Sequence, residues 1–530
     1  MPQPFTRRHF LNMVGAAGGS AAVLQAAVAL GLMPSGAEAH TPRAELMPLG
    51  RNGRSVVVLG AGLSGLVCAY ELERAGYDVT VIEASKRIGG RNMTVRSGDL
   101  IDEMGNPQIC QFDDHPNLYM NCGPARIPAH HSNVLHYCKT LNVPLEVFVN
   151  VNYHAYVQDP DAFGGRPIRM REYMADARGF MTELAAKAIS QPDFDAPFSA
   201  EDMERFLAFL RAYGDLDPNL LYKGSARAGY ASGGMTEPPT LKPPLDFSEI
   251  LKSSFWRFRM HWGEGEDQAA PLMQAVGGND NIVKGFVRNI RSRIVTGAPV
   301  QSITLREDGV DVVYDDRGRP RQVSADYCFN CIPKHLLHGI PNNFPVEYST
   351  AMANVGRGKL FKIGLQMRER FWERENIYGG ISWTNQDVEQ IWYPSHGIHG
   401  DKGVMLGAYV FNDETNDRLA RLSQAERIEV AVRAGEQIHP DYRKYVETGV
   451  TIAWHRMNYL MGCTAKWTEE ARERYFKTLQ DPVGRHYLIG DQVSYHPGWQ
   501  EGAISSAHHA LADLDQRVRA EMGHSATGAA

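Results

Sequence analysis

Residues 55–91 read SVVVLGAGLSGLVCAYELERAGYDVTVIEASKRIGGR. The segment at 56–59 is apolar and β-branched, as in a buried parallel strand. The loop after it has the pattern G-x-G-x-x-G, formed by Gly60, Gly62 and Gly65. In dinucleotide folds such glycines permit a tight turn, a close approach of backbone N–H groups to a pyrophosphate, and close packing of the next helix on the strand. This loop predicts a dinucleotide site.

The remainder of the stretch supplies the other parts of that site. We expect a helix at 63–75, whose positive N-terminal end points at the phosphates. A second strand at 78–82 delivers Glu83 to where a ribose would lie, since a carboxylate can accept hydrogen bonds from both hydroxyls. A lone G-x-G-x-x-G is often an ordinary turn. Strand, loop, helix, strand and acid in register predict a Rossmann-like α/β domain.

Two further segments extend the pattern. Gly89-Gly90-Arg91 follows Glu83 closely, and YLIGD at 487–491 is a short apolar strand that ends in Gly-Asp, itself a common turn. GWQEGAI at 498–504 follows, at the expected start of a helix. Together with the glycine loop, these segments resemble the FAD-dependent amine oxidase superfamily. The resemblance implies FAD as the cofactor, which the loop alone does not distinguish from NAD.

The resemblance also assigns cofactor contacts. It places Asp491 near the ribityl and pyrophosphate groups, and the N–H groups of 502–504 opposite the flavin pyrimidine. A helix N-terminus there stabilises the negative charge of reduced flavin. The expected cofactor residues are Gly60, Gly62, Leu63, Ser64, Gly65, Glu83, Ala84, Gly90, Arg91, Gly123, Pro124, Ala125, Arg126, Asp491, Gly498, Gly502, Ala503 and Ile504.

A substrate motif follows the first cofactor segment. NCGPARIP at 121–128 resembles the G-P-x-R-[IL]-P of L-amino acid oxidases within this superfamily. The resemblance implies that Arg126 binds the α-carboxylate of the substrate, and a planar guanidinium matches a carboxylate well. The alternative is a structural ion pair between Arg126 and Asp102 or Glu103.

Three more residues gain a catalytic role from the same resemblance. IWYPSH at 391–396 is similar to a segment whose tyrosine, here Tyr393, hydrogen-bonds the carboxylate. Trp499 takes the position of an aromatic wall against the flavin. Lys362 matches in spacing a lysine that holds a water on flavin N5 and aids the reaction with oxygen. The ordinary alternatives are a strand-end aromatic for Tyr393 and a solvated strand lysine for Lys362, with Lys359 as a nearby competitor.

The seven cysteines are an odd number, so they cannot all pair internally. Cys328 and Cys331 form a C-x-x-C within 323–332, which we interpret as a strand with two buried thiols on opposite faces. Cys68 is expected in the core of the first helix. YLMGC at 459–463 resembles the segment that carries a covalent flavin in monoamine oxidases, whereas L-amino acid oxidases bind FAD non-covalently. Cys463 therefore permits a covalent bond or is a small buried residue.

The N-terminus resembles an export signal. TRRHFL at 6–11 is similar to a twin-arginine motif, and an apolar segment at 14–32 precedes Ala-Glu-Ala at 37–39. Residues 1–39 are therefore expected to be a signal peptide, cleaved before His40, and the twin-arginine machinery a partner. The alternative is a membrane anchor, since the apolar segment could nearly span a bilayer. Export implies a periplasmic or secreted enzyme that folds around FAD beforehand.

Composition agrees with this class. The chain has 530 residues and a net charge of −6. A mildly acidic surface argues against nucleic acid or anionic membranes as partners, and no later segment is apolar enough to span a membrane. No metal site is predicted. The assembly stays open, with a homodimer as one alternative. We expect the tail at 519–530 to be disordered from His524 onwards.

The chain is expected to weave between domains. VGGNDNI at 276–282 resembles the family's return to the flavin domain. The predicted fold is α/β, with a Rossmann-like FAD-binding domain interleaved with a substrate domain of mixed sheet plus helices and a helical lid. The FAD-binding domain comprises 50–122, 267–345 and 455–518. The substrate domain comprises 123–150 and 346–454, and the lid comprises 151–266.

The resemblance implies oxidative deamination of an L-amino acid. Hydride transfer to FAD would give a 2-oxo acid, ammonia and, with dioxygen as co-substrate, hydrogen peroxide. A primary-amine or polyamine oxidase, an amino acid monooxygenase, a dehydrogenase with another electron acceptor and a non-catalytic flavoprotein remain alternatives. Which side chain is accepted cannot be derived from these motifs.

Overall fold

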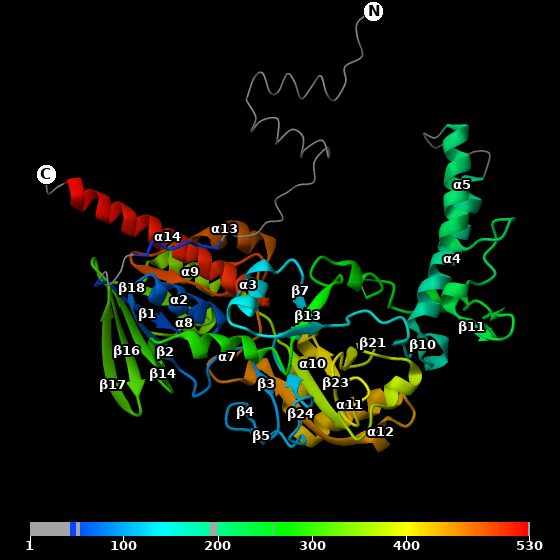
Figure 1. Ribbon diagram of the computed structural model, residues 1–530, viewed down its shortest axis with the longest axis horizontal. Coiled ribbons are helices and arrows are strands. Elements are labelled where there is room, and N and C mark those ends of the chain that lie inside the picture. Colours follow the sequence, from blue (N-terminus) through cyan, green and yellow to red (C-terminus); the bar gives the residue numbers. More distant parts are fainter. Residues whose placement is uncertain (1–42, 49–52, 191–198, 258, 528–530) are drawn as a thin grey trace, which may run out of the picture. The chain divides into compact units, whose positions relative to one another are not determined.

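The computed structural model describes residues 43–48, 53–190, 199–257 and 259–527 (Figure 1). The chain divides into two units, Met1–Ala44 and Glu45–Ala530. The fold below is that of the second unit. The expected signal peptide at 1–39 lies outside the described residues. Within the described part of the chain, no helix combines the length and apolar character needed to cross a membrane.

A five-stranded parallel sheet carries the dinucleotide loop. Its strands, in spatial order, are β14 (Arg293–Thr296), β2 (Asp78–Glu83), β1 (Ser55–Leu59), β18 (Tyr327–Asn330) and β26 (His486–Leu488). Helix α2 (Leu63–Arg74) starts directly after Gly62 and packs between β2 and α14 (Gln500–Thr527). The predicted strand, helix and strand of the opening stretch are confirmed to within a residue or two.

An antiparallel layer covers one face of this sheet. Strands β15 (Val300–Leu305), β16 (Val310–Asp316) and β17 (Arg319–Ala325) form it in that order. Val57 and Leu59 of β1 share a buried apolar cluster with Ile303 and Val312 of this layer. Because both faces of the parallel sheet are covered, β1 can be apolar from Val56 to Leu59, and Val79, Val81 and Ile82 of β2 are buried.

A seven-stranded mixed sheet forms the second half of the molecule. In order it contains β10 (Ile168–Arg169), β9 (Tyr156–Gln158), β21 (Gly380–Thr384), β22 (Gln390–Tyr393), β23 (Gly403–Val410), β20 (Phe361–Met367) and β24 (Val446–Ala453). Helix α11 (Gln424–Glu436) packs on one face, where Ile363 and Leu365 enter a large apolar cluster. Lys362 and Gly364 point to the opposite face, since side chains alternate along a strand.

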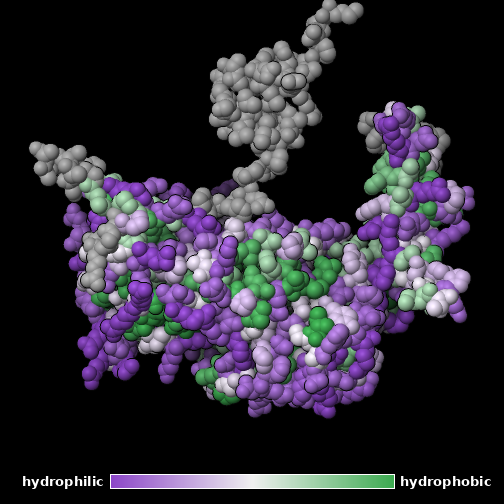
Figure 2. Space-filling model, in the orientation of Figure 1, coloured by the Kyte–Doolittle hydropathy of each residue, from purple (hydrophilic) through white to green (hydrophobic). Residues whose placement is uncertain are grey.

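The insertion between β10 and β13 (Leu272–Ala275) in the sequence is largely helical. Helices α4 (Met170–Ile189) and α5 (Ala200–Gly214) lie side by side (Figure 1). They pack closely because Gly214 meets Thr182, where an added Cβ would lie 1.7 Å from the threonine hydroxyl. Figure 2 shows hydrophobic residues among hydrophilic ones on this pair of helices, and Met181 and Leu184 are more than half exposed.

Short elements complete the fold. They are β3 (Thr94–Val95), β4 (Leu100–Asp102), β5 (Pro107–Ile109), β6 (Met120–Asn121), β7 (Ile127–Pro128), α3 (Ser132–Thr140), β8 (Leu145–Val147), β11 (Tyr230–Ser232), β12 (Thr240–Leu241), α6 (Phe247–Lys252), β13 (Leu272–Ala275), α7 (Asp280–Asn289), α8 (Lys334–Leu337), α9 (Val346–Ala353), β19 (Gly356–Arg357), α10 (Asp413–Arg421), α12 (Tyr442–Tyr445), β25 (Ala465–Lys466) and α13 (Glu469–Gln480). β7, β13 and β8 form a small antiparallel sheet.

The structure shifts some predicted domain borders. The expected lid at 151–266 begins with β9 and β10, which belong to the seven-stranded sheet. Helix α3, expected in the substrate domain, packs on α14, and the Tyr137 hydroxyl donates to Glu71 of α2 at 2.6 Å. Helix α9 likewise contributes Tyr348 to the core beneath the parallel sheet. Packing over long sequence separations sets these borders, and local pattern does not reveal it.

Two local predictions are wrong. The segment 323–332 is not one strand, because it changes sheets at Asp326 between β17 and β18. Cys328 is buried as expected, but Cys331 follows the strand, and its thiol donates to the Gly60 carbonyl at 3.1 Å. Of the tail expected to be disordered from His524, the residues up to Thr527 continue helix α14, because extending an existing helix is easier than nucleating one, and residues 528–530 lie outside the described residues.

Candidate active site

A cavity of about 650 Å³ opens where the parallel strands end. It is bounded by the glycine loop, the segment after β2, the GPAR segment and the start of α14. The predicted cofactor residues that line it are Gly60, Gly62, Leu63, Ser64, Glu83, Ala84, Gly90, Arg91, Gly123, Pro124, Asp491, Gly498 and Ala503. Segments that are hundreds of residues apart therefore meet around one cavity, at the strand ends where α/β folds bind ligands.

Three of the glycines that were expected to contact the cofactor have different structural roles. Gly60 has a φ of +96°, a conformation that residues with a Cβ rarely adopt. A Cβ on Gly65 would lie 2.1 Å from the Gly60 carbonyl oxygen, so this glycine allows α2 to touch the strand. Gly502 does not line the cavity, and a Cβ there would lie 2.2 Å from the His496 carbonyl oxygen. The side chain of Ile504 is buried.

Glu83 closes the loop from the second strand. Its Oε2 accepts from the backbone N–H of Ala61 at 2.6 Å, and its Oε1 accepts from that of Ser85 at 2.8 Å. Burial raises the pKa of Glu83, while these two donors oppose the rise. The carboxylate is thus fixed at the end of β2, where the ribose contact was expected.

Arg91 and Asp491 join the N-terminal and C-terminal cofactor segments. The Arg91 Nη1 donates to Asp491 Oδ2 at 2.9 Å, and its Nη2 donates to Oδ1. The same Oδ2 accepts from the backbone N–H of Gly498 at 2.7 Å. Burial lowers the pKa of Arg91, but Asp491 raises it by more. The pair fixes the loop that precedes Trp499.

Arg126 is surrounded by the side chains of Trp262, Trp392 and Trp499, here called the aromatic chamber, of which Trp499 also lines this cavity. Its side chain is 8% exposed, and its guanidinium carbon lies 4.7 Å from the ring centre of Trp262, 5.1 Å from Trp392 and 5.3 Å from Trp499. Its Nε donates to Gln268 Oε1 at 2.9 Å. Burial lowers the pKa of Arg126 to about 10.

No carboxylate among the described residues pairs with Arg126. The alternative partners have other contacts: Glu103 pairs with Arg427 at 2.8 Å, and Asp102 accepts from the backbone of Gly105. A cation buried without a counter-charge is costly unless a ligand supplies one. Cation–π contacts with the tryptophans offset part of that cost. The chamber is therefore suited to a ligand that carries an anionic group.

Lys362 is buried in β20, which excludes a solvated position on the strand. Its ammonium donates to the carbonyl oxygens of Gly123 at 2.6 Å and Asn121 at 3.1 Å, and lies 4.4 Å from the ring centre of Tyr409. Burial lowers the pKa of Lys362 to about 8. Lys359, the competitor, instead makes a surface ion pair with Asp417 at 2.6 Å. The structure thus attaches Lys362 to the segment that carries Arg126.

Tyr393 does not reach the chamber, contrary to the prediction. Its hydroxyl bonds to the Ser382 hydroxyl at 2.7 Å and to His439 Nε2 at 2.8 Å, within the cluster under α11. Its neighbour Trp392 contacts Arg126 instead. Adjacent residues on a strand point to opposite faces, so the motif was read on the wrong face of β22.

Several residues around Arg126 and Lys362 were not identified as site residues from the sequence motifs. Trp392 could have been found from strand alternation beside Tyr393. Tyr409 of β23 lies in register with Lys362, a pairing that only the sheet reveals. Trp262 and Gln268 come from the segment before β13 and carried no signal of their own.

Cys463 lines the cavity and is half-buried. Its backbone carbonyl accepts from Arg91, and burial raises the pKa of its thiol, which favours the neutral form. All seven cysteines are free. This position is compatible with either expectation for Cys463.

Comparison with known proteins now gives the chain a family. A family model described as "Flavin containing amine oxidoreductase" matches residues 63–514. The chain belongs to this family. A second match, to "Pyridine nucleotide-disulphide oxidoreductase", spans residues 12–105 and so includes the dinucleotide loop.

Relatives of this flavin-containing amine oxidoreductase include enzymes named for amino acids. The flavin-dependent L-tryptophan oxidase RebO of Lentzea aerocolonigenes is 26% identical over 502 residues, covering 88% of this chain and 99% of the relative. The L-amino-acid oxidase of Echis ocellatus is 26% identical, covering 88% and 90%. The putative L-amino-acid oxidase YobN of Bacillus subtilis is 25% identical, covering 87% and 96%.

Solved structures share the fold. Cyclohexylamine oxidase from Brevibacterium oxydans has a TM-score of 0.59 at 16% identity, covering 88% of this chain and 99% of that one. Putrescine oxidase bound to putrescine has a TM-score of 0.58 at 20% identity, covering 87% and 98%. Together with the family, the glycine loop, Glu83 and the cavity fit FAD. This flavin-containing amine oxidoreductase therefore takes FAD as its cofactor.

Proposed function

We propose that this flavin enzyme oxidises L-amino acids to 2-oxo acids, with release of ammonia and hydrogen peroxide. One observation carries the proposal: Arg126 is buried beside the cofactor cavity, and its charge has no carboxylate partner among the described residues. Relatives named L-amino-acid oxidase support it. An amine without a carboxylate would leave this cation uncompensated.

Arg126 binds the substrate in this proposal. With a pKa of about 10 the guanidinium stays charged at neutral pH, and it can donate two parallel hydrogen bonds to an α-carboxylate. Gln268 holds one edge of the guanidinium and so fixes its plane. The three tryptophans exclude water, which strengthens the ion pair that a substrate would form.

The other residues orient the reacting end. Trp499 follows Gly498, which Asp491 holds in place, and it forms one wall between Arg126 and the cavity. Bound FAD supplies the two-electron acceptor for the amine, and dioxygen restores its oxidised form. Lys362, held by Gly123, is the proposed aid to the oxygen reaction. The imino acid that is released hydrolyses in water to the 2-oxo acid and ammonia.

Anaerobic bleaching of the flavin tests the substrate class. The purified holoprotein would be mixed with L-amino acids, D-amino acids, primary amines and polyamines. We expect bleaching by L-amino acids, and slow bleaching or none by the matching amines that lack the carboxylate. Bleaching by amines alone would establish an amine oxidase instead. Bleaching by none of these compounds would indicate a flavoprotein without this activity.

Product analysis separates the remaining alternatives. An oxidase yields a 2-oxo acid and hydrogen peroxide in equal amounts. A monooxygenase would yield an amide and carbon dioxide, and a dehydrogenase would need an added acceptor and make little peroxide. Either result would replace the proposed reaction while leaving the substrate class intact.

We also propose export by the twin-arginine route, on the sequence of residues 6–39 alone. The enzyme would then act in the periplasm or outside the cell. Fractionation of cells that express the full chain should place the mature protein, beginning at His40, outside the cytoplasm. The double substitution Arg7→Lys and Arg8→Lys should retain it inside. Unchanged distribution of that variant would refute the proposal.

A further inference from the structure

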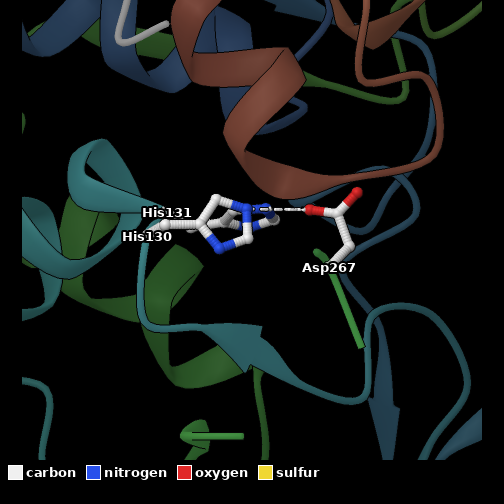
Figure 3. A group of neighbouring side chains, drawn as sticks. All are labelled: His130, His131 and Asp267. Carbon is white, nitrogen blue, oxygen red and sulfur yellow. Dashed lines mark hydrogen bonds and ion pairs between the residues drawn. The ribbon is translucent and has the colours of Figure 1, made fainter. Parts of the chain in front are cut away.

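Two imidazoles and a carboxylate gather next to the aromatic chamber (Figure 3). His130 and His131 stand between β7 and α3, while Asp267 precedes β13. The pair and the acid are 137 and 136 residues apart, so no ligand spacing could be recognised in the sequence. The group takes no part in the proposed oxidation.

Backbone pairing brings these segments together. Strand β13 runs antiparallel to β7, with Leu272 opposite Pro128. The pairing continues past the strand, where the Ala129 N–H donates to the Pro271 carbonyl at 3.2 Å. The histidines are therefore held by the small sheet on one side and by α3 on the other. His131 is 1% exposed, so its position is set by packing.

The two histidines present the same atom to the acid. Nε2 of His131 lies 2.8 Å from Asp267 Oδ1, and Nε2 of His130 lies 3.1 Å from the same oxygen. The three ligand atoms lie within 4.8 Å of one another, and both rings face the carboxylate in Figure 3. The imidazole planes cross at 84°, so the nitrogens approach from different directions.

A third nitrogen lies close by. Nδ1 of His496, in the loop before α14, is 3.9 Å from the other oxygen, Oδ2, of Asp267. Both oxygens of Asp267 therefore have imidazole nitrogens nearby, two at Oδ1 and one at Oδ2. Three imidazole nitrogens thus lie around one carboxylate, and both ligand types suit a divalent transition metal.

We propose that His130, His131 and Asp267 bind a divalent transition-metal ion of the zinc class, with His496 as a fourth ligand. Imidazole nitrogens and a carboxylate oxygen are ligands that zinc prefers. At zinc–ligand distances of about 2.0–2.1 Å, tetrahedral ligands lie about 3.3 Å apart. The separations of 2.8 and 3.1 Å need to open by only a few tenths of an ångström.

Metal binding would replace the hydrogen bonds within the group. His130 and His131 must each present an unprotonated Nε2, and His496 an unprotonated Nδ1. Without a metal, the same atoms form a hydrogen-bonded histidine–aspartate network, and that is the competing explanation.

Metal binding at this site would affect ligand binding in the aromatic chamber. Asp267 directly precedes Gln268, whose Oε1 accepts from Arg126. The edge of His131 contacts the ring of Trp499, with centroids 5.1 Å apart. An ion that fixes Asp267 and His131 would therefore change the affinity for a ligand at Arg126, through Gln268 and Trp499.

Calorimetric titration of the metal-stripped, untagged holoprotein with Zn²⁺ alone at neutral pH tests the proposal. We expect one equivalent of Zn²⁺ to bind, and His130→Ala to weaken binding by about tenfold or more. The matched control His338→Ala removes an exposed histidine outside the group and should bind as the wild type does. Flavin absorbance and Tm verify that each variant is folded.

A second variant and a spectroscopic measurement test whether these side chains are the ligands. Asp267→Asn keeps the size of the side chain, removes its charge and should also weaken Zn²⁺ binding. With Cu²⁺ in place of Zn²⁺, electron paramagnetic resonance should show nitrogen splittings that diminish in His130→Ala. Absence of saturable Zn²⁺ binding, or equal binding by the wild type, His130→Ala and Asp267→Asn, would overturn the proposal in favour of the hydrogen-bonded network. These readouts do not depend on which substrate the enzyme oxidises.

Discussion

The cofactor half and the substrate half of the molecule treat a positive charge in opposite ways. Arg91, in the cofactor cavity, forms a bidentate pair with Asp491, which raises its pKa. Arg126, in the aromatic chamber, has three tryptophans and an amide around it, and burial lowers its pKa to about 10. One half completes its charges within the protein. The other leaves a charge for the ligand.

This difference separates architecture from recognition. A paired arginine ties distant segments together, and its removal should act on folding and on cofactor retention. An unpaired buried arginine opposes folding, and its removal should weaken substrate binding while stability stays the same or rises. The two kinds of substitution should therefore have opposite profiles of stability and activity.

Arg126→Met should give the largest effect. The loss of a desolvated ion pair with the substrate corresponds to about 4 kcal/mol, or about a thousandfold decrease in kcat/KM for L-amino acids. The Tm should stay the same or rise, because a buried charge is removed. Steady-state kinetics and thermal unfolding measure both. The control is Arg418→Met, at an exposed arginine of α10 that pairs with Asp387, and a fall in Tm for Arg126→Met beyond that of the control would contradict the comparison.

Lys362→Met extends the comparison to the second buried cation of the substrate half. The pKa of about 8 lies below the ordinary 10.5, so the unfolded state binds more protons between these values and the wild type gains stability as the pH rises from 8 to 10.5. The gain is at most about 3 kcal/mol, and the variant should lack it. Denaturant unfolding across this pH range measures it. Lys359→Met should keep the gain, and equal slopes in all three proteins would refute the assignment.

Asp491→Asn should act on the other half. It leaves Arg91 without its carboxylate and should lower the free energy of unfolding by about 2 kcal/mol, less than for a fully buried pair because Arg91 keeps 31% of its side chain exposed. Retention of FAD during gel filtration should fall with it. Asp417→Asn breaks a surface pair and should change stability by less than about 1 kcal/mol. If Asp491→Asn and Asp417→Asn were equally stable, the Arg91–Asp491 pair would not stabilise the fold.

The smallest effect is expected at Cys463. Acid precipitation should leave a colourless pellet and the flavin in solution, since burial keeps this thiol neutral. Cys463→Ser should retain as much FAD as the wild type. A yellow pellet that becomes colourless in Cys463→Ser would establish a covalent flavin, and the cofactor half would then hold its ligand by more than charge and shape.

Local sequence pattern predicted the cofactor half well. The apolar run of β1, the glycines and Glu83 lie within one short stretch, where strand and helix periodicities are strong. The pairing of Arg91 with Asp491 was not predictable in this way, because 400 residues separate them. The sequence motifs named both residues, but only the fold shows that they are partners.

The substrate half was harder to predict. Arg126 and Lys362 were identified through a resemblance, and the structure places both near the cavity while their roles stay predictions. Tyr393 was assigned to the wrong face because the sheet, and not the motif, determines which of two adjacent side chains faces the ligand. Trp262 begins a single 3₁₀ turn (Trp262–Glu264), which is too short for a periodicity to mark a contact. Aromatic walls of this kind depend on tertiary packing.

The Arg91–Asp491 pair also has a consequence for the order of events during synthesis. Asp491 follows β26, the last strand of the parallel sheet, so the cradle stays incomplete until nearly the whole chain has left the ribosome. Cofactor loading must then follow translation. A transporter that accepts only folded cargo, as in the proposed export route, would then accept the protein only after β26 and α14, the last strand and helix to be synthesised, have folded.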